Sequence, residues 1–205
     1  MTPAAMTVKQ PVPDPRQAGS GMRLLLWEIQ SPINFGMLLR VAETYRVPVG
    51  ALGSNRVFGD AGHNAIVSDF ACGALTRRGF TALADPAAAD AWRGGARLVA
   101  TSIDRDAVAL SEFRFQPGDV VVLGNEYDGL PDEVVAAADQ KIVIPMAQVW
   151  TPKPRSVSPI DPARVAPVTR DGEPNLNVAV AGAIICYAAY VQAVAERSAD
   201  QGVLA

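Results

Sequence analysis

The sequence has few of the residues on which the commonest catalytic and structural devices depend. Its 205 residues include two cysteines, both in apolar stretches, and one histidine, His63. No CxxC pair or Cys/His cluster occurs, which argues against a zinc site and a disulfide framework. A Ser-His-Asp triad would need His63, yet no GxSxG elbow is present. We expect no zinc site, a reducing cytoplasmic compartment, and His63 in a polar loop.

Signatures of phosphate binding are also missing. No GxGxxG follows a strand pattern and no GxxxxGK[ST] occurs, so the Rossmann and P-loop interpretations lack the backbone cradle that each needs. An excess of basic residues is missing as well, because 18 Lys and Arg stand against 21 Asp and Glu, a net charge of −3. This balance argues against a general nucleic-acid binder, but it leaves a local basic face open.

Charge is absent from one long stretch, residues 178–195. A minimal membrane span also needs roughly 18 apolar residues. The alanines and glycine of this run, its polar Gln192 and the lack of a flanking basic cluster favour a buried helix, and we expect no membrane association. Residues 1–21 are rich in proline and have no apolar core, so we interpret them as a disordered leader. One domain, residues 22–200, is expected to follow.

What the sequence does contain is an alternation of short apolar strands with helices. Such an alternation predicts an α/β fold with a mostly parallel sheet flanked by helices. The pattern over 65–75 is a mixture of loop and helix. Extended chain is expected over 23–29, 49–52, 97–102, 119–123 and 141–144, and helix from near 36, over 82–92, over 131–138 and over 178–195.

Polar and glycine residues follow several of these expected strands. Asn34 comes after the first strand, Thr101 ends another, and Gly124-Asn125-Glu126 directly follows 119–123. Ligands of parallel sheets bind beyond the carboxyl ends of the strands. Gly124 would let a ligand approach the main chain closely, or it would simply permit a tight turn.

Arg40 is unusual because it stands in an otherwise apolar segment, between Leu39 and Val41. We expect this arginine to be buried, and a buried guanidinium needs a partner. A carboxylate such as Glu126 and a bound phosphate are both suitable, and one arrangement could include the two.

Three stretches resemble the signature motifs of the SpoU (TrmH-like) branch of the SPOUT methyltransferases, over about residues 23–195. The first motif matches at Asn34, Gly36, Arg40 and Ala42, the second at Gly124, Asn125, Glu126, Gly129 and Leu130, and the third at Ile144, Pro145, Met146, Leu176, Asn177, Val178 and Ala181. The resemblance implies a deep carboxyl-terminal trefoil knot, an exception to the general absence of knots.

The same resemblance implies a homodimer that binds S-adenosylmethionine and methylates a ribose 2′-hydroxyl of RNA without a metal ion. The small single-domain build favours tRNA over rRNA as the substrate. On this resemblance the catalytic residues are Arg40, Asn34, Glu126 and Asn177. The residues expected to contact the cofactor are Thr101, Gly124, Asn125, Ile144, Met146, Asn175 and Leu176.

Two departures from the family pattern affect these expectations. Asn175 stands where the family has a serine, so an amide replaces a hydroxyl. A proline-rich insertion, residues 147–174, lengthens a loop that is usually short. Its Trp150, Lys153 and Arg155 could stack on a base and pair with phosphates, or the insertion could cover the cofactor pocket or a partner chain.

Two other functions therefore stay open at this point. A protein of the same fold could bind RNA or the cofactor without turnover, which the change at Asn175 and the insertion would explain. Alternatively, the enzyme could methylate a small molecule or a base nitrogen, which the net negative charge permits.

Overall fold

The computed structural model describes residues 19–59, 61–147, 157, 163 and 176–200. Most of the predicted leader and of the predicted insertion therefore lies outside the described residues, and so do Trp150, Lys153, Arg155 and Asn175.

The centre of the fold is a seven-stranded sheet in the order β3-β2-β1-β6-β4-β7-β5. Each pair of neighbouring strands is parallel, as predicted. The strands are β1 (Arg23–Trp27), β2 (Val49–Leu52), β3 (Thr81–Leu83), β4 (Leu98–Thr101), β5 (Val108–Ala109), β6 (Val120–Leu123) and β7 (Gln140–Val143).

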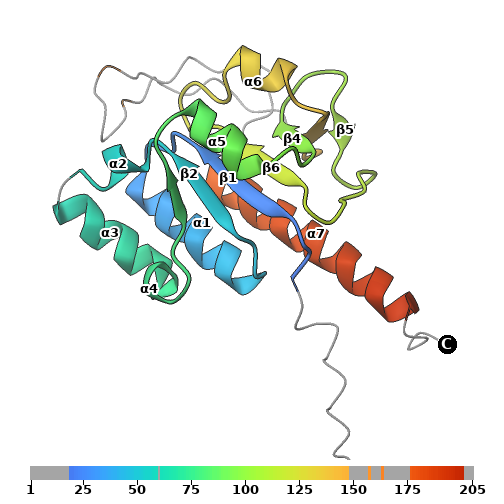
Figure 1. Ribbon diagram of the computed structural model, residues 1–205, viewed down its shortest axis with the longest axis horizontal. Coiled ribbons are helices and arrows are strands. Elements are labelled where there is room, and N and C mark those ends of the chain that lie inside the picture. The colour runs from blue at the N-terminus through green and yellow to red at the C-terminus, as the bar shows by residue number, and fades with distance from the viewer. Residues whose placement is uncertain (1–18, 60, 148–156, 158–162, 164–175, 201–205) are drawn as a thin grey trace, which may run out of the picture.

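Helices cover both faces of this sheet (Figure 1). One face packs against α1 (Pro32–Thr44), α3 (Ala61–Ala71) and α7 (Val178–Asp200), and the other against α5 (Pro86–Arg93) and α6 (Asp132–Ala136). Two short helices, α2 (Ser54–Val57) and α4 (Ala74–Arg77), flank α3.

The central strands are apolar throughout because both of their faces are covered. Leu24 and Leu26 of β1 belong to the core cluster under α1 and α7, whereas Leu25 between them belongs to the cluster under α5. All four residues of β6 are buried, and β6 pairs with β1 on one side and β4 on the other. The run 120–123 thus forms the middle of the molecule.

Helix α1 begins earlier than the sequence predicts. The Ser31 side chain accepts a hydrogen bond from the backbone N–H of Asn34, and Pro32 stands in the first turn, where its missing N–H costs nothing. Asn34 is therefore a residue of the first helical turn and not of a loop. Two turns of α1 pack so closely on α3 that a Cβ on Gly36 would lie 2.6 Å from the carbonyl oxygen of Val67.

Helix α7 confirms the predicted charge-free helix and extends it to Asp200. By length and composition it could cross a membrane, with a mean hydropathy of 1.9 and 28% of the apolar window buried, a test that core helices of soluble proteins also pass. Gln192 both accepts from the N–H and donates to the carbonyl of Phe115, so its polar side chain is used inside the fold. Burial on the same helix raises the pKa of the Cys186 thiol to about 12.

Several short elements differ from the expectations. β3 and β5 were not predicted, and His63 lies in the first turn of α3 rather than in a loop. The segment 65–75 resolves into the end of α3 and the start of α4. The predicted knot depends on the path of residues 148–175, most of which lie outside the described residues, and it stays a prediction.

Candidate active site

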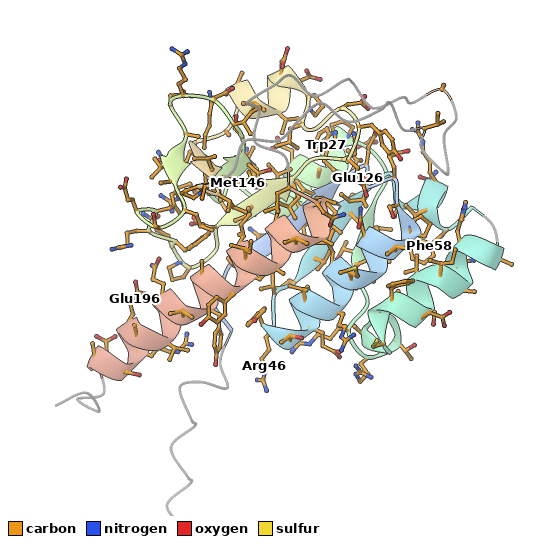
Figure 2. The ribbon with its side chains drawn as sticks, turned by 180° about the vertical axis from the view of Figure 1, so that it is seen from behind. Trp27, Arg46, Phe58, Glu126, Met146 and Glu196 are labelled. Carbon is orange, nitrogen blue, oxygen red and sulfur yellow. The ribbon has the colours of Figure 1, made fainter. Side chains whose placement is uncertain are left out.

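The carboxyl ends of β1, β6, β4 and β7 lie at one edge of the sheet, because these neighbouring strands are all parallel. Figure 2 shows Trp27, Glu126 and Met146 at this end of the molecule, where α7 begins, and Arg46 and Glu196 at the opposite end. The three stretches that carry the sequence motifs therefore meet at a single edge.

Glu126 is the centre of a hydrogen-bond network at this edge. Its Oε2 accepts from the backbone N–H of Gln30 at 2.9 Å, and its Oε1 accepts from the N–H of Ser31 at 3.2 Å. The side-chain amide of Asn34 donates a third bond to Oε1 at 2.6 Å. Both carboxylate oxygens are thus occupied by donors from the chain that links β1 to α1, and Glu126 fixes that chain to the β6 loop.

Asn34 extends this network to the carboxyl-terminal helix. Its Oδ1 accepts from the side-chain amide of Asn177 at 3.1 Å. The Oδ1 of Asn177 in turn accepts from the N–H groups of Ala179 and Val180, at 2.9 and 3.3 Å, and so caps the start of α7. Asn34 is buried while Asn177 is exposed, so the network runs from the interior to the surface.

This Asn177–Asn34–Glu126 network joins residues up to 143 positions apart in the chain. The sequence-based expectation that these three side chains meet is therefore confirmed. The two amides and the carboxylate hold the starts of α1 and α7 against the loop after β6. Their catalytic roles stay predictions.

Arg40 does not join the network, and the expectation that it is buried is wrong; of the two partners considered for it, Glu126 takes its hydrogen bonds from other donors. Its side chain is exposed, and its Nη1 donates to the sulfur of Cys72 at 3.2 Å. The reason is the helical period: Arg40 follows Asn34 by six residues, so the two point in different directions and stand about 9 Å apart along the axis. Arg40 instead shares the outer face of α1 with Ile33 and Met37, which are also exposed.

Cys72 was expected in apolar surroundings, but it is exposed. Arg77 donates to the Cys72 carbonyl at 3.1 Å and forms a two-bond ion pair with Glu43 of α1. The hydrogen bond from Arg77 lowers the pKa of Glu43 and raises that of Arg77. Cys72 therefore stands in a polar junction that ties α4 to α1.

Gly124 and Asn125 shape the loop after β6. A Cβ on Gly124 would lie 2.2 Å from the carbonyl carbon of Gly129, so the turn itself requires a glycine here. The Oδ1 of Asn125 accepts from the N–H groups of Tyr127 and Asp128, both at 2.8 Å. The loop is thereby closed on itself and presents its outer backbone at the sheet edge.

A family model matches most of the domain that the structure describes. A model described as the SpoU rRNA methylase family matches residues 21–151. The chain belongs to this family.

A curated relative of this SpoU chain is the tRNA (cytidine(34)-2′-O)-methyltransferase of Ancylobacter novellus. It is 34% identical over 152 residues, which are 73% of this chain and 73% of the relative. The relative's length is thus largely represented here.

Solved structures agree on the fold. A structure described as giving insights into the 2-OH methylation of C/U34 on tRNA is 26% identical, with a TM-score of 0.62, and covers 83% of this chain and 95% of that one. The SpoU methyltransferase AviRb from Streptomyces viridochromogenes, in complex with AdoMet, is 21% identical, with a TM-score of 0.61, and covers 82% of this chain and 56% of that one. Together with the family match they show that this chain has the SPOUT fold.

Five of the positions expected to hold the cofactor have described side chains, and these divide into two groups in this SpoU chain. The side chains of Thr101 and Asn125 are used within the fold, Thr101 by donating to the carbonyl of Val122 at 3.1 Å. Ile144, Met146 and Leu176 are apolar and only half-buried at the same edge. Such side chains, with the backbone groups of the surrounding loops, fit the adenine and ribose of S-adenosylmethionine.

Sequence reasoning missed three contributors to this edge. Gln30 and Ser31 bind Glu126 through backbone N–H groups, which no motif of side chains can indicate. Tyr127 donates from its hydroxyl to the carbonyl of Val157 at 3.2 Å and so connects the β6 loop with the predicted insertion. Its place in the second motif was the available signal.

Proposed function

We propose that this chain is an S-adenosylmethionine-dependent RNA methyltransferase that transfers a methyl group to a ribose 2′-hydroxyl of tRNA. The observation that carries the proposal is the Asn177–Asn34–Glu126 network, which gathers the three family motifs at one sheet edge. The relatives that are named as enzymes acting on nucleotide 34 of tRNA support the choice of substrate.

The cofactor would bind over Ile144, Met146 and Leu176, beside the loop that follows Gly124. Its sulfonium supplies an electrophilic methyl group. The AviRb complex with AdoMet supports this choice of methyl donor. Among the described residues, no group of His, Cys, Asp and Glu side chains could hold a metal ion. The proposed reaction requires none.

Arg40 is the residue that we propose acts on the substrate. A guanidinium stays protonated under nearly all conditions, so it is a poor proton acceptor. It is well suited to bind the phosphate beside the target ribose and to stabilise the oxyanion that develops at the 2′-oxygen. The 2′ proton then passes to an oxygen of that phosphate. Asn34, Asn177 and Glu126 keep the loops in a fixed geometry for this step.

We also propose a homodimer formed through the outer faces of α1 and α7. Large apolar side chains are exposed there in a stripe that runs along both helices, and α1 and α7 pack against each other. The stripe consists of Ile33, Met37, Val180, Ile184, Tyr187 and Val191. Exposed apolar patches of this kind mark interaction surfaces. Because Arg40 continues the exposed face of α1, such a dimer would set Arg40 at the junction of the two chains.

The proposed site of action is the cytoplasm, where tRNA and reduced thiols are both found. Two free cysteines, Cys72 and Cys186, agree with a reducing compartment.

The decisive experiment is transfer of radiolabelled methyl from S-adenosylmethionine to total tRNA by the purified full chain, followed by mass mapping of the product. We expect 2′-O-methyl ribose, with nucleotide 34 as the first position to test. Cofactor binding without transfer to any RNA would identify a non-catalytic homologue. Label on a base nitrogen or in a small molecule would replace the ribose as the acceptor.

A further inference from the structure

The outer face of α1 carries a contact that the family motifs do not include. Within the part of the chain that the structure describes, the Arg40 guanidinium donates one hydrogen bond, to the Cys72 sulfur at 3.2 Å. Cys72 comes from the turn between α3 and α4, and not from α1. A residue 32 positions away thus directs the side chain on which the proposed methyl transfer depends.

The thiol is oriented for this purpose by its own hydrogen bond. The Cys72 sulfur donates to the carbonyl of Asp69 at 3.4 Å, and the Cys72 N–H approaches the same oxygen at 3.3 Å. With its proton directed to Asp69, the sulfur presents lone pairs to Arg40. Sulfur is a weak acceptor, and the charge on the guanidinium strengthens the bond.

The backbone at Cys72 is held in an uncommon conformation. Its φ of 50° lies in the left-handed region, which residues other than glycine rarely adopt. Arg77 stabilises this turn by donating to the Cys72 carbonyl, and the Arg77–Glu43 ion pair fastens the turn to α1 one helical turn beyond Arg40. The sulfur is therefore fixed relative to the helix that carries Arg40.

We propose that Cys72 is a positioning residue, which holds the Arg40 guanidinium in one orientation for the substrate. The proposal rests on the proposed function, because Arg40 is taken to act in methyl transfer. A long, exposed arginine would otherwise sample many rotamers, and ordering it before the substrate binds removes an entropic cost from the reaction.

The first test measures Arg40 directly and does not depend on activity. In full-length protein labelled with ¹⁵N, the heteronuclear NOE of the Arg40 Nε–H reports how ordered the side chain is. We expect Cys72→Ala to lower this NOE towards that of the exposed Arg46, and Cys72→Ser, which keeps an acceptor, to preserve most of it. An Arg40 NOE unchanged in Cys72→Ala would overturn the proposal.

The second test measures kcat and KM for methyl transfer to tRNA. We expect Cys72→Ala to lower kcat about tenfold with the KM for S-adenosylmethionine unchanged, and Cys72→Ser to restore most of the loss. In an Arg40→Lys background the same change should have little further effect, because the sulfur acts through the guanidinium. Full, independent loss in that background would contradict the assignment.

Folding defects are separated by a further variant. Cys72→Gly also removes the sulfur, and glycine adopts a positive φ without strain, so this variant should fold at least as well as Cys72→Ala. It should show the same loss of kcat and of Arg40 order. If the unmodified chain transfers no methyl group, the proposed function fails, while the NOE experiment still decides whether Cys72 orders Arg40.

Discussion

Glu126 receives all of the hydrogen bonds at the centre of the site from N–H donors of one short segment, residues 30–34. A carboxylate is the side chain best suited to this position, because it offers acceptors only. An amide there would turn an NH₂ group towards one of the donors. The hydrogen bonds that Glu126 accepts therefore explain why a carboxylate stands at this position, without any catalytic role.

Replacing Glu126 by glutamine should destabilise the fold by about 1–3 kcal/mol, because at least one buried donor loses its acceptor. Urea unfolding followed by circular dichroism measures this change. Glu133→Gln is the matched control, since Glu133 is exposed on α6 and should change stability little. Equal midpoints for the two variants would show that the network contributes nothing to stability.

Replacing Arg40 by alanine should abolish methyl transfer while leaving the affinity for S-adenosylmethionine largely intact. Arg40 is exposed on α1 and is not one of the half-buried apolar side chains expected to bind the cofactor, so its loss should not disturb that pocket. Isothermal calorimetry and radiolabel transfer measure the two quantities. Arg46→Ala is the control, because Arg46 is exposed at the opposite end of the molecule (Figure 2). A large loss of cofactor affinity in Arg40→Ala would contradict the assignment.

At the scale of elements, Gly36 shows that a motif residue can be required by packing. Its Cβ position is bounded by Val67, Phe70 and Ala71 of α3, and two of these contacts are with backbone atoms that cannot rotate away. Helices α1 and α3 therefore approach at this point as closely as glycine permits. The motif glycine sets the position of α1, and with it the position of Asn34.

Gly36→Ala should cost about 1–3 kcal/mol through overpacking, despite the better helix propensity of alanine. Thermal unfolding measures the loss. Gly62→Ala is a matched control, because Gly62 is exposed in α3 and the same substitution there should be neutral or slightly stabilising. A Gly36→Ala variant as stable as the unmodified chain would mean that α1 and α3 separate without cost.

The elements that the sequence predicted well are β1 and β6, whose apolar pattern is set by burial on both faces, and α7, whose long charge-free run indicated a helix. β3 and β5 were missed because they have three and two residues, too few to show any alternation. The meeting of Asn34 and Glu126 was predictable because parallel strands end at one edge, whereas the place of Asn177 was expected from the family resemblance.

The position of Arg40 was not predictable from its apolar neighbours in the sequence. Its exposure depends on which face of α1 the other helices leave open, and that depends on the close approach of α3 and α7. The Cys72 contact depends on a positive φ between α3 and α4, which no local pattern indicated.

At the scale of the whole molecule, one face of the described protein is too apolar for a surface that only meets water. The long apolar window of α7 is only 28% buried, and its outward side chains continue the exposed apolar side chains of α1. We expect a second copy of the chain to cover these apolar side chains, because a two-fold axis pairs identical patches with each other. This arrangement would place the two α7 helices near the axis.

Ile184→Glu should therefore convert a dimer into a monomer, because it sets a charge in the middle of the apolar stripe. Light scattering coupled to size exclusion measures the mass at micromolar concentration. Ala91→Glu, exposed on α5 across the sheet, adds the same charge outside the stripe and should leave the dimer intact. If the unmodified chain is itself a monomer under these conditions, the stripe has another partner and the proposed dimer is wrong. If Ile184→Glu stays dimeric, the chains associate through a different face.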